Sequence, residues 1–482
     1  MAKKDIVGRQ YEQELLEERR SSGKAELIAV YGRRRVGKTF LIREMFDDQF
    51  AFTFTGMYEA SRVVQLEQFR VSLQQYSGQA VPRLKDWFEA FAALRQYLSA
   101  LSSEKEVVVF LDELPWMDTP KSNFITAFGY FWNTWASTFS KLKLIVCGSA
   151  TTWMLSRLIG DKGGLYGRVT RAIYLAPFSL GETEQFLNGK KEMNLTRRQV
   201  LDVYMIVGGV PYYLDMLKKG MPMDTNIDCL FFKKGAPLQV EFEFLFRSLF
   251  KDSLSYRKVV EVLSAKMKGM TRKELIEAMK LKSGGVLTEI LENLERCDFI
   301  RRYSSIGKNE REALYQLTDL FSLFYLRFVT NKNGLDEKFW SNMRNEGSRN
   351  AWSGYAFEQV CLHHIPQIKK ALGISGVLTN IHSWSCRPFV DATGAEWKGG
   401  QIDMLIDRAD GAINICEMKY AKEEYTITAD YDQRMRERMS SFQAATKTKK
   451  ALLNTFVTTY GIKRNMYSGM VNSEVKTDDL FL

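Results

Sequence analysis

The sequence has few of the residues that build disulfide frameworks and zinc sites, and it has no long hydrophobic run. Its six cysteines are scattered singly, it has three histidines, and no Cys-x-x-Cys pair is present. We therefore expect neither a disulfide framework nor a structural zinc site. No run of about 18 apolar residues exists, so we expect no membrane-spanning helix. The N-terminal Met-Ala-Lys-Lys-Asp lacks the apolar core of a signal peptide, and together these absences predict a cytoplasmic protein.

Length and positive charge are what the sequence has in quantity. A chain of 482 residues is too long for one hydrophobic core, and its length predicts about three domains. The formal net charge is +11, which is compatible with DNA or RNA as a partner because basic surface attracts phosphate. Many basic proteins bind nothing anionic, so the charge permits this partner without establishing it.

A phosphate-binding motif follows the first apolar run, residues 27–31, which has the form of a buried strand. The motif Gly-x-x-x-x-Gly-Lys-Thr is complete, and Phe40 begins helical apolar spacing directly after it. Its residues are Gly32, Arg33, Arg34, Arg35, Val36, Gly37, Lys38 and Thr39. Backbone N–H groups of such a loop face phosphates, Lys38 reaches the β- and γ-phosphates, and the Thr39 hydroxyl holds magnesium. The sequence predicts ATP and Mg²⁺ as cofactors; the alternative is a chance match in a glycine turn.

Two further strands are expected to complete this site. Residues 107–111 are apolar and end in Asp112 and Glu113, as a parallel strand does when its carboxyl end carries function. Asp112 would orient magnesium or its water shell, and Glu113 would polarise the attacking water. Residues 142–148 form another apolar run, after which Ser149 is a candidate to sense the γ-phosphate. A simple strand-terminating turn is the alternative for Ser149.

Motifs at this spacing resemble those of the AAA+ ATPases. In detail the sequence resembles the signal-transduction (STAND) branch of archaeal and bacterial P-loop ATPases, whose members often carry a C-terminal nuclease-like domain. The matching stretches follow in family order at residues 6–9, 32–39, 111–120, 147–150, 165–168 and 207–213, and Asp-Glu-Leu-Pro-Trp from Asp112 is the most specific of them. With the C-terminal stretch, the resemblance covers nearly the whole chain.

The resemblance implies roles for matching residues around the nucleotide. Gly8 and Arg9 would lie near the adenine. Gly209 and Pro211 would close the lid over the nucleotide, where other AAA+ proteins often use a sensor arginine.

An arginine is also expected to neutralise charge that develops during phosphoryl transfer. The resemblance implies Arg168 for this role, acting in cis or from a neighbouring subunit of a homo-oligomer. Arg171 is a rival, and a surface ion pair is the alternative for both.

The middle of the chain has the order of a winged helix. Helical patterns cover residues 256–265 and 286–297, a capping box runs from Thr271 to Glu274, and strands at 299–303 and 313–317 could pair around the charged loop 308–312. The third helix is rich in glutamate, which repels phosphate. We therefore favour a protein partner at this domain over base reading. Residues 335–350 are polar, with glycines at both ends, and are expected to form a linker.

A second constellation of charged residues lies near the C-terminus. Residues 401–407 and 412–420 predict a hairpin that places Asp403 opposite Glu417, with Lys419 on the same face as Glu417. Two facing carboxylates repel unless a cation joins them. Asp followed by Glu-x-Lys resembles the PD-(D/E)xK nuclease core, and Glu358 matches the helical glutamate of that superfamily. The resemblance implies a metal held by Glu358, Asp403 and Glu417, with Lys419 as a catalytic residue.

Two details qualify the nuclease resemblance. Ile402 stands where the family pattern has proline. Downstream, Arg434, Arg436 and Arg438 could contact a phosphate backbone, although a solvated helix face explains them equally well. Solvated strand charges are the alternative for the acids and Lys419, and a degenerate fold that binds without cutting stays open.

The sequence as a whole predicts an α/β protein with a P-loop AAA+ core on a parallel sheet, a helical lid, a winged helix and a C-terminal α/β PD-(D/E)xK-like domain. The expected bounds are 1–178, 179–240, 241–332 and 351–482. The leading interpretation is an ATP-hydrolysing switch coupled to a nuclease-like effector domain that acts on nucleic acid. Two alternatives remain: a non-cleaving nucleotide-dependent sensor or scaffold that binds protein or DNA, and a DNA-binding regulator with a vestigial C-terminal sheet.

Overall fold

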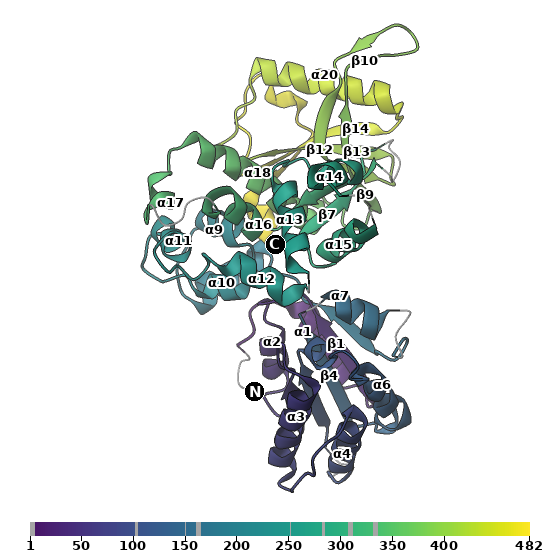
Figure 1. Cartoon of the computed structure of the whole chain (residues 1–482). Helices are drawn as coiled ribbons and strands as arrows, with labels where there is room; N and C mark the ends of the chain where they lie inside the picture. The colour runs from purple at the N-terminus through teal and green to yellow at the C-terminus, as the bar shows by residue number, and fades with distance from the viewer. Residues whose placement is uncertain are drawn as a thin grey trace. The chain divides into compact units, whose positions relative to one another are not determined.

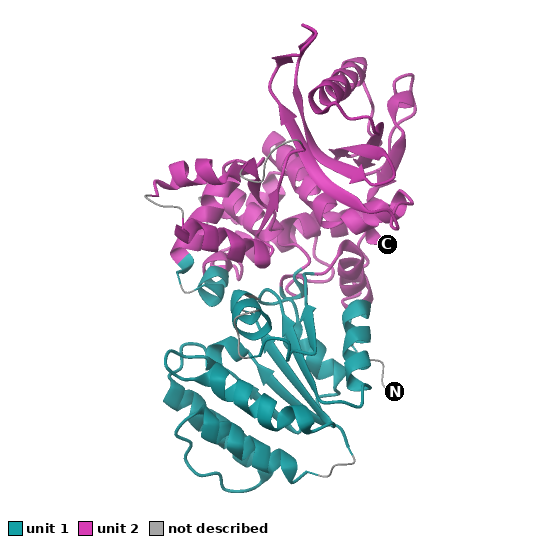
Figure 2. Ribbon diagram, turned by 90° about the vertical axis from the view of Figure 1, so that its right-hand side faces the viewer, with its two compact units in different colours: residues 1–177, 210–212, 244–253 teal, residues 178–209, 213–243, 254–482 magenta. Residues whose placement is uncertain are grey.

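The computed structural model describes residues 5–101, 105–149, 151–160, 165–250, 252–281, 285–306, 312–330 and 336–482. The chain forms two compact units, which Figure 2 shows in different colours. Unit 1 contains residues 1–177, 210–212 and 244–253, and unit 2 contains the rest. Most of the predicted charged loop at 308–312 lies outside the described residues. Within the described part of the chain, no helix is long and apolar enough to cross a membrane.

Unit 1 is built on a five-stranded parallel sheet, as the sequence predicts for an α/β protein. The strand order is β2-β3-β4-β1-β5, so β4 lies between β1 and β3. The strands are β1 (Glu26–Tyr31), β2 (Phe52–Thr55), β3 (Val107–Asp112), β4 (Leu142–Gly148) and β5 (Arg171–Tyr174). Because all strands are parallel, the carboxyl ends of β1, β3 and β4 meet at one edge.

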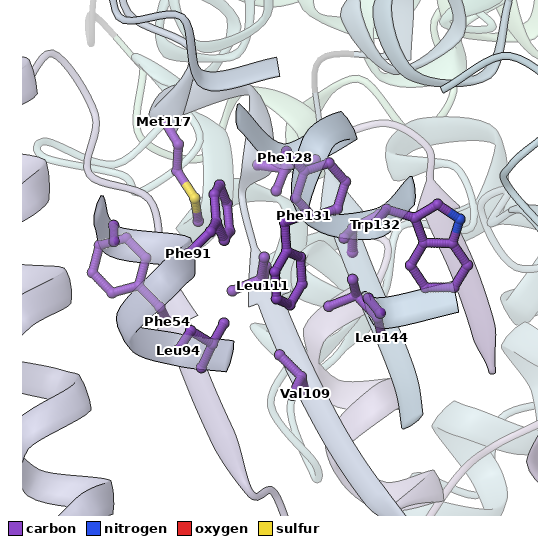
Figure 3. Close-up of a cluster of buried hydrophobic side chains, with 14 of the residues drawn as sticks. Phe54, Phe91, Leu94, Val109, Leu111, Met117, Phe128, Phe131, Trp132 and Leu144 are labelled. Atoms are coloured by element: carbon purple, nitrogen blue, oxygen red, sulfur yellow. The ribbon is translucent and has the colours of Figure 1, made fainter. Parts of the chain in front are cut away.

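Helices cover both faces of this sheet (Figure 1). One buried cluster includes side chains of α1 (Gln10–Arg20) and α2 (Lys38–Met45). A larger cluster takes side chains from α3 (Arg62–Ser77), α4 (Trp87–Ser99) and α6 (Phe124–Thr134). Figure 3 shows part of this cluster, where Phe91 and Phe128 pack with Leu111 of β3. The central strands are therefore buried on both sides, which explains their uninterrupted apolar sequences. Short helices α5 (Leu114–Met117) and α7 (Thr151–Trp153) follow β3 and β4.

Short helices dominate the stretch that was predicted as the lid. They are α8 (Leu180–Glu184), α9 (Arg197–Val207), α10 (Pro211–Asp215) and α11 (Met223–Phe231). Helix α12 (Glu241–Leu249) follows directly after the predicted lid. Capping boxes at Ser179 and Thr196 define where α8 and α9 begin. Gly209 follows α9 at a crowded position, because a Cβ there would lie 1.8 Å from the Phe178 carbonyl oxygen. Helix α9 thus ends at Gly208 and Gly209.

The next stretch has the helices and strands that the sequence predicts. Helices α13 (Ser253–Ser264), α14 (Arg272–Met279) and α15 (Gly285–Arg296) are followed by β7 (Ile300–Tyr303) and β8 (Leu314–Leu317). The strands pair antiparallel, and β6 (Met270–Thr271) joins them in the order β6-β8-β7. The capping box between Thr271 and Glu274 is present.

The prediction of a linker is wrong for residues 336–350. This stretch contains α17 (Phe339–Asn342) and the start of α18 (Gly347–His363), and it follows α16 (Leu320–Phe324) and a π-helical turn (Tyr325–Val329). Trp340 is buried and packs against Phe324, Phe328 and Trp352. Phe339 packs against Phe232 and Phe328 as well, so two adjacent aromatic side chains anchor this otherwise polar stretch. Helix α18 contains Glu358, which the sequence expects on a helix.

A mixed five-stranded sheet organises the C-terminal stretch, in the order β15-β14-β13-β12-β9. Its strands are β9 (Thr379–Cys386), β12 (Gly400–Arg408), β13 (Ala412–Lys419), β14 (Ala451–Thr458) and β15 (Ser473–Lys476). The short strands β10 (Phe389–Val390) and β11 (Glu396–Trp397) pair with each other. Helices α19 (Ile365–Ala371) and α20 (Ala429–Thr446) complete the stretch. The predicted hairpin is confirmed, since β12 and β13 pair antiparallel with Met404 opposite Cys416.

Candidate functional site

The predicted phosphate loop follows β1 and ends at the first turn of α2. Gly32 has φ 150° and lies so close to the next strand connection that a Cβ would be 2.3 Å from the Leu175 carbonyl oxygen. Gly37 has φ 91° and precedes the first residue of α2. Both positions therefore require glycine. The loop delivers its backbone to the N-terminus of a helix, which is where a phosphate group is bound most readily.

Lys38 is buried, and its ammonium group is held against the loop. Its Nζ donates hydrogen bonds to the carbonyl oxygens of Gly32 and Arg33, each at 3.0 Å. Burial lowers the pKa of Lys38, while the nearby carboxylates of Glu113 and Asp112 oppose that shift. The structure therefore places the cation inside the curl of the loop, and its contact with the β- and γ-phosphates stays a prediction.

Thr39 and Asp112 meet across the sheet edge. The Thr39 hydroxyl donates to Asp112 Oδ2 at 2.8 Å, and the backbone N–H of Glu113 donates to Asp112 Oδ1 at 3.0 Å. Burial raises the pKa of Asp112, and both hydrogen bonds oppose that shift. A hydroxyl and a carboxylate at contact distance fit a Mg²⁺ ion, which prefers oxygen ligands and keeps several of its waters.

Glu113 is held by the neighbouring strand rather than by the phosphate loop. Its Oε2 accepts hydrogen bonds from the Ser149 hydroxyl at 2.9 Å and from the Ser149 backbone N–H at 3.2 Å. Burial raises the pKa of Glu113, the charge of Lys38 opposes this rise, and the charge of Asp112 adds to it. Because β4 lies between β1 and β3, Ser149 stands between the phosphate loop and the candidate base. The sequence predicted that Glu113 and Ser149 belong to one site, but it did not indicate the hydrogen bonds between them.

Gly8 and Arg9 lie in the turn before α1. Arg9 is buried and has a φ of 59°, and its guanidinium donates to the Ala176 carbonyl oxygen at 2.6 Å and to the Val36 carbonyl oxygen at 3.5 Å. Gly8 O accepts from Gln13 Nε2 at 2.7 Å. Arg9 thus ties the N-terminal turn to the chain after β5, a structural role that its motif did not reveal. Its contact with adenine stays a prediction.

The remaining loop residues differ in their surroundings. Arg33 is buried, whereas Phe40 is 42% exposed on the first turn of α2. The Arg35 guanidinium lies over the Tyr212 ring, 4.1 Å from the ring centre. Tyr212 directly follows Pro211, and residues 210–212 belong to unit 1. The contact therefore places the residues that are predicted to close the lid beside the phosphate loop. Sequence reasoning passed over Tyr212, although it stands inside the Pro-Tyr-Tyr motif.

The two candidate arginines lie away from the phosphate loop in the same chain. Thr170 donates to the Leu27 carbonyl oxygen at 2.9 Å, and Arg171 pairs in register with Ile28, near the start of β1. The phosphate loop follows the other end of β1, about 10 Å farther along. Arg168 is exposed and precedes Thr170. This placement does not support contact with the γ-phosphate in cis, and contact from a neighbouring subunit stays a prediction.

Glu417 of the second constellation is buried and fully engaged by other side chains. Its Oε1 accepts from the Arg438 guanidinium, and its Oε2 accepts from the Tyr431 hydroxyl. Lys419 Nζ lies 3.3 Å from Oε2 and 5.2 Å from the Tyr431 ring centre. Glu417 and Lys419 thus meet as predicted. Their further partners, Arg438 and Tyr431, come from α20, whose arginines the sequence left open between phosphate contacts and a solvated face.

The other two acids lie on neighbouring elements without gathering around a metal position. Continuing the register of β12 and β13 places Asp403 opposite Glu417, as the sequence predicts. Asp403 is exposed, however, and accepts from Gln401. Burial in α18, with the charge of Asp403, raises the pKa of Glu358 to about 8. Among the described residues, no three Asp, Glu, His or Cys side chains are arranged to hold a metal ion. The arrangement therefore does not fit a ready metal site.

The three arginines of α20 do not form one phosphate-binding face. Arg438 turns inward to Glu417 and to the Gln401 carbonyl oxygen. Arg436 pairs with Asp432 at 3.0 Å, and Arg434 lies over the Tyr431 ring. The sequence showed their charge but not the partners that occupy it.

Residues 6–217, which contain the phosphate loop, Asp112, Glu113 and Ser149, match the model of an ATPase domain predominantly from Archaea. The chain belongs to the P-loop ATPases. An uncharacterized ATP-binding protein of Methanocaldococcus jannaschii is 49% identical over 44 residues, which is 9% of this P-loop ATPase and 75% of the relative. An uncharacterized protein of the same organism, MJECL04, is 24% identical over 382 residues, covering 79% of this chain and 81% of the relative.

Solved structures that are similar to this P-loop ATPase share little sequence with it. A Walker-type ATPase of Pyrococcus abyssi is 19% identical, with a TM-score of 0.45 over 67% of this chain and 96% of that chain. Drosophila ORC bound to DNA is 13% identical, with a TM-score of 0.35 over 68% of this chain and 89% of that chain.

Proposed function

We propose that this P-loop ATPase is an ATP-hydrolysing AAA+ switch of the signal-transduction type that controls a nuclease-like effector domain acting on nucleic acid. In this proposal residues 1–178 bind and hydrolyse ATP, 179–240 form the lid, 241–332 form a winged helix and 351–482 form the effector. The order of helices and strands in each stretch supports this division.

At the nucleotide, each residue has a distinct task. The loop backbone and Lys38 hold the phosphates, and Lys38 neutralises charge on the γ-phosphate. Mg²⁺, held by Thr39 and oriented by Asp112, would supply further charge neutralisation. Glu113, whose carboxylate is oriented by Ser149, takes the proton of the attacking water.

The observation that carries the link to the effector is a joint inside unit 2. Tyr420, the residue after Lys419, donates its hydroxyl to Asp202 of α9 at 2.6 Å. Arg198 of α9 pairs with Asp202 at 3.1 Å, lies 4.0 Å from the Tyr420 ring centre and donates to the Ala421 carbonyl oxygen. Helix α9 ends at the glycines that precede Pro211. A change in the lid therefore reaches the strand end that carries Glu417 and Lys419 through direct contacts.

A cleavage assay tests the proposal. The full chain is incubated with Mg²⁺ on double-stranded DNA, single-stranded DNA and RNA, with and without ATP. Cleavage of one substrate that depends on ATP and disappears in Lys419→Ala and in Lys38→Ala is the expected result. No cleavage of any substrate, with ATP hydrolysis intact, would sink the effector half of the proposal.

A second candidate function is a non-cleaving sensor or scaffold, and the contacts of Glu417 favour it. Arg438, Tyr431 and Lys419 occupy both carboxylate oxygens, so we assign no chemical step to a metal there. In this alternative the same lid joint would alter a docking surface instead of an active site.

A further inference from the structure

Unit 2 contains a cavity of about 310 Å³ that is lined in part by two acids of the nuclease-like motif. One wall comes from the stretch around β7 and β8, and the other comes from α18 and β12. The first wall contributes Lys268, Arg301, Tyr303 and Gln316, and the second contributes Glu358 and Asp403. The volume lies at the lower end of the range for small-molecule sites.

Two neighbouring side chains hold the guanidinium of Arg301 in this cavity. Its Nε donates to Gln316 Oε1 at 2.7 Å, and its guanidinium lies 4.3 Å from the centre of the Tyr303 ring. Gln316 is itself fixed, because its Nε2 donates to the Met267 carbonyl oxygen at 2.7 Å. The planar group is thus held in orientation before any ligand arrives, which lowers the entropy cost of binding.

The terminal nitrogens of Arg301 have no partner within the part of the chain that the structure describes. They donate no hydrogen bond there, and no carboxylate lies within 4 Å of them, although Glu358 and Asp403 line the same cavity. A half-buried guanidinium that faces a cavity without an ion pair is a ready ligand for a planar or tetrahedral anion. Phosphate oxygens match its fork of donors.

We propose that this cavity binds a phosphate group carried by a nucleotide or a nucleic-acid strand, with Arg301 as its principal ligand. Lys268 adds a second positive charge on the same wall. The tyrosines fix this wall, since Tyr303 donates to the Lys268 carbonyl oxygen at 2.6 Å and Tyr355 donates to that of Met267 at 3.1 Å. The inference rests on the proposed function only in taking nucleic acid as the source of the phosphate.

The acidic side chains that line the cavity predict how phosphate binding responds to a change of charge. The carboxylate of Asp403 repels an anion in the absence of a divalent cation, whereas the raised pKa of Glu358 keeps that group largely neutral at pH 7. Asp403→Asn should therefore tighten phosphate binding in EDTA by about two- to ten-fold, since it removes one negative charge at short range. A site that recognised phosphate by shape alone would bind it with the same affinity in Asp403→Asn as in the wild type.

The test measures binding of the dinucleotide d(pTpT) by titration calorimetry in EDTA. The full chain carries Lys38→Ala throughout, so that the nucleotide site does not compete. Adding Arg301→Gln should weaken binding by at least about ten-fold. The matched control is Arg302→Gln, because Arg302 is the next residue on β7, is exposed, and projects to the other face of the strand. Its effect should stay below about two-fold.

Each outcome decides something. No saturable binding, or equal losses in Arg301→Gln and Arg302→Gln, overturns the inference. Arg301→Lys, which keeps the charge but loses the fork, should give an intermediate affinity and guards against a folding artefact of Arg301→Gln. Tighter binding of d(pTpT) than of inorganic phosphate assigns the site to nucleic acid, and equal binding assigns it to free phosphate. Because this assay contains no metal, it measures binding apart from cleavage. Arg301-dependent binding in EDTA, together with no cleavage in the Mg²⁺ assay of the proposed function, would sink the nuclease and leave this inference standing.

Discussion

Ser149 donates both its hydroxyl and its backbone N–H to the same carboxylate oxygen of Glu113. Removing the hydroxyl in Ser149→Ala takes away one of these two bonds, so Glu113 should lose part of its orientation. We expect ATP hydrolysis to slow by about three- to ten-fold, the value of one hydrogen bond, with ATP affinity nearly unchanged. Both are measured by steady-state kinetics and nucleotide titration.

The pH profile of Ser149→Ala separates positioning from a general structural effect. The Ser149 bonds oppose the rise that burial causes in the pKa of Glu113. Losing the hydroxyl should therefore raise this pKa further and move the acid limb of the rate profile to higher pH. An unchanged acid limb in a slower enzyme would contradict the role of Ser149.

Glu113→Gln should keep ATP bound but slow hydrolysis by about a hundred-fold or more, since the amide keeps the shape and cannot accept the proton of water. Glu14→Gln, on an exposed position of α1, is the control and should hydrolyse ATP normally. Turnover at the wild-type rate in Glu113→Gln would reduce Glu113 to an acid that ends a strand.

Lys38→Ala should abolish ATP binding or weaken it severely, because the loop loses the cation that reaches the β- and γ-phosphates. Calorimetry measures the affinity, and circular dichroism confirms that the variant is folded. Lys24→Ala, which removes an exposed lysine before β1, should bind ATP normally. An unchanged affinity in folded Lys38→Ala would refute the nucleotide site.

Much of the nucleotide site was predictable because its signals are local. The loop glycines, Lys38 and Thr39 are consecutive, and Asp112 ends a strand whose apolar run marks it as buried. What the sequence could not show is contact between segments far apart in the chain. The Ser149 bonds to Glu113 and the Arg35 contact with Tyr212 depend on strand order and backbone path, which local patterns do not specify.

The C-terminal stretch is a second case in which local patterns predicted the register of two strands but not the contacts with distant segments. Equal spacing of Asp403 and Glu417 from the turn predicted their register, because hairpin geometry is local. The partners of Glu417 lie on α20, and nothing in the spacing of Arg438 indicates that it turns inward. The linker prediction failed because polar composition outweighed Trp340, whose burial depends on aromatic rings from the helical elements before and after it in the chain.

The pair of Glu417 and Arg438 should be strongly coupled in stability. Arg438→Ala leaves a buried carboxylate with fewer partners and should destabilise unit 2 by about 2–3 kcal/mol. In a double-mutant cycle with Glu417→Ala, the second substitution should cost much less once the first is made. Denaturant unfolding followed by tryptophan fluorescence measures the cycle. Additive losses would mean that the pair contributes through packing alone.

His364 predicts a specific acid sensitivity. Its Nε2 accepts from the Leu180 N–H at 3.0 Å, so the ring is neutral, and burial lowers its pKa from 6.5 to about 4. Because the folded pKa lies below the unfolded one, this contribution to stability is complete above pH 6.5 and is lost as pH falls toward 4. At pH 5 the loss should be about 2 kcal/mol.

The comparison that isolates this effect is wild type against His364→Gln, each unfolded by denaturant at pH 7 and pH 5. Other groups titrate in both proteins, so the difference between the two pH-dependent losses reports on His364. A wild-type protein that loses no more stability than His364→Gln would show that the ring is not held neutral.

The joint of Arg198, Asp202 and Tyr420 limits how this chain can be divided. A polypeptide that ends near residue 350 lacks Tyr420, which bonds to Asp202 of α9, and His364, which bonds to the first turn of α8. A premature stop codon or gene fission at that point should therefore remove the proposed effector domain and also destabilise residues 179–240, the proposed lid. Related chains should therefore either retain both of these regions or lack both of them.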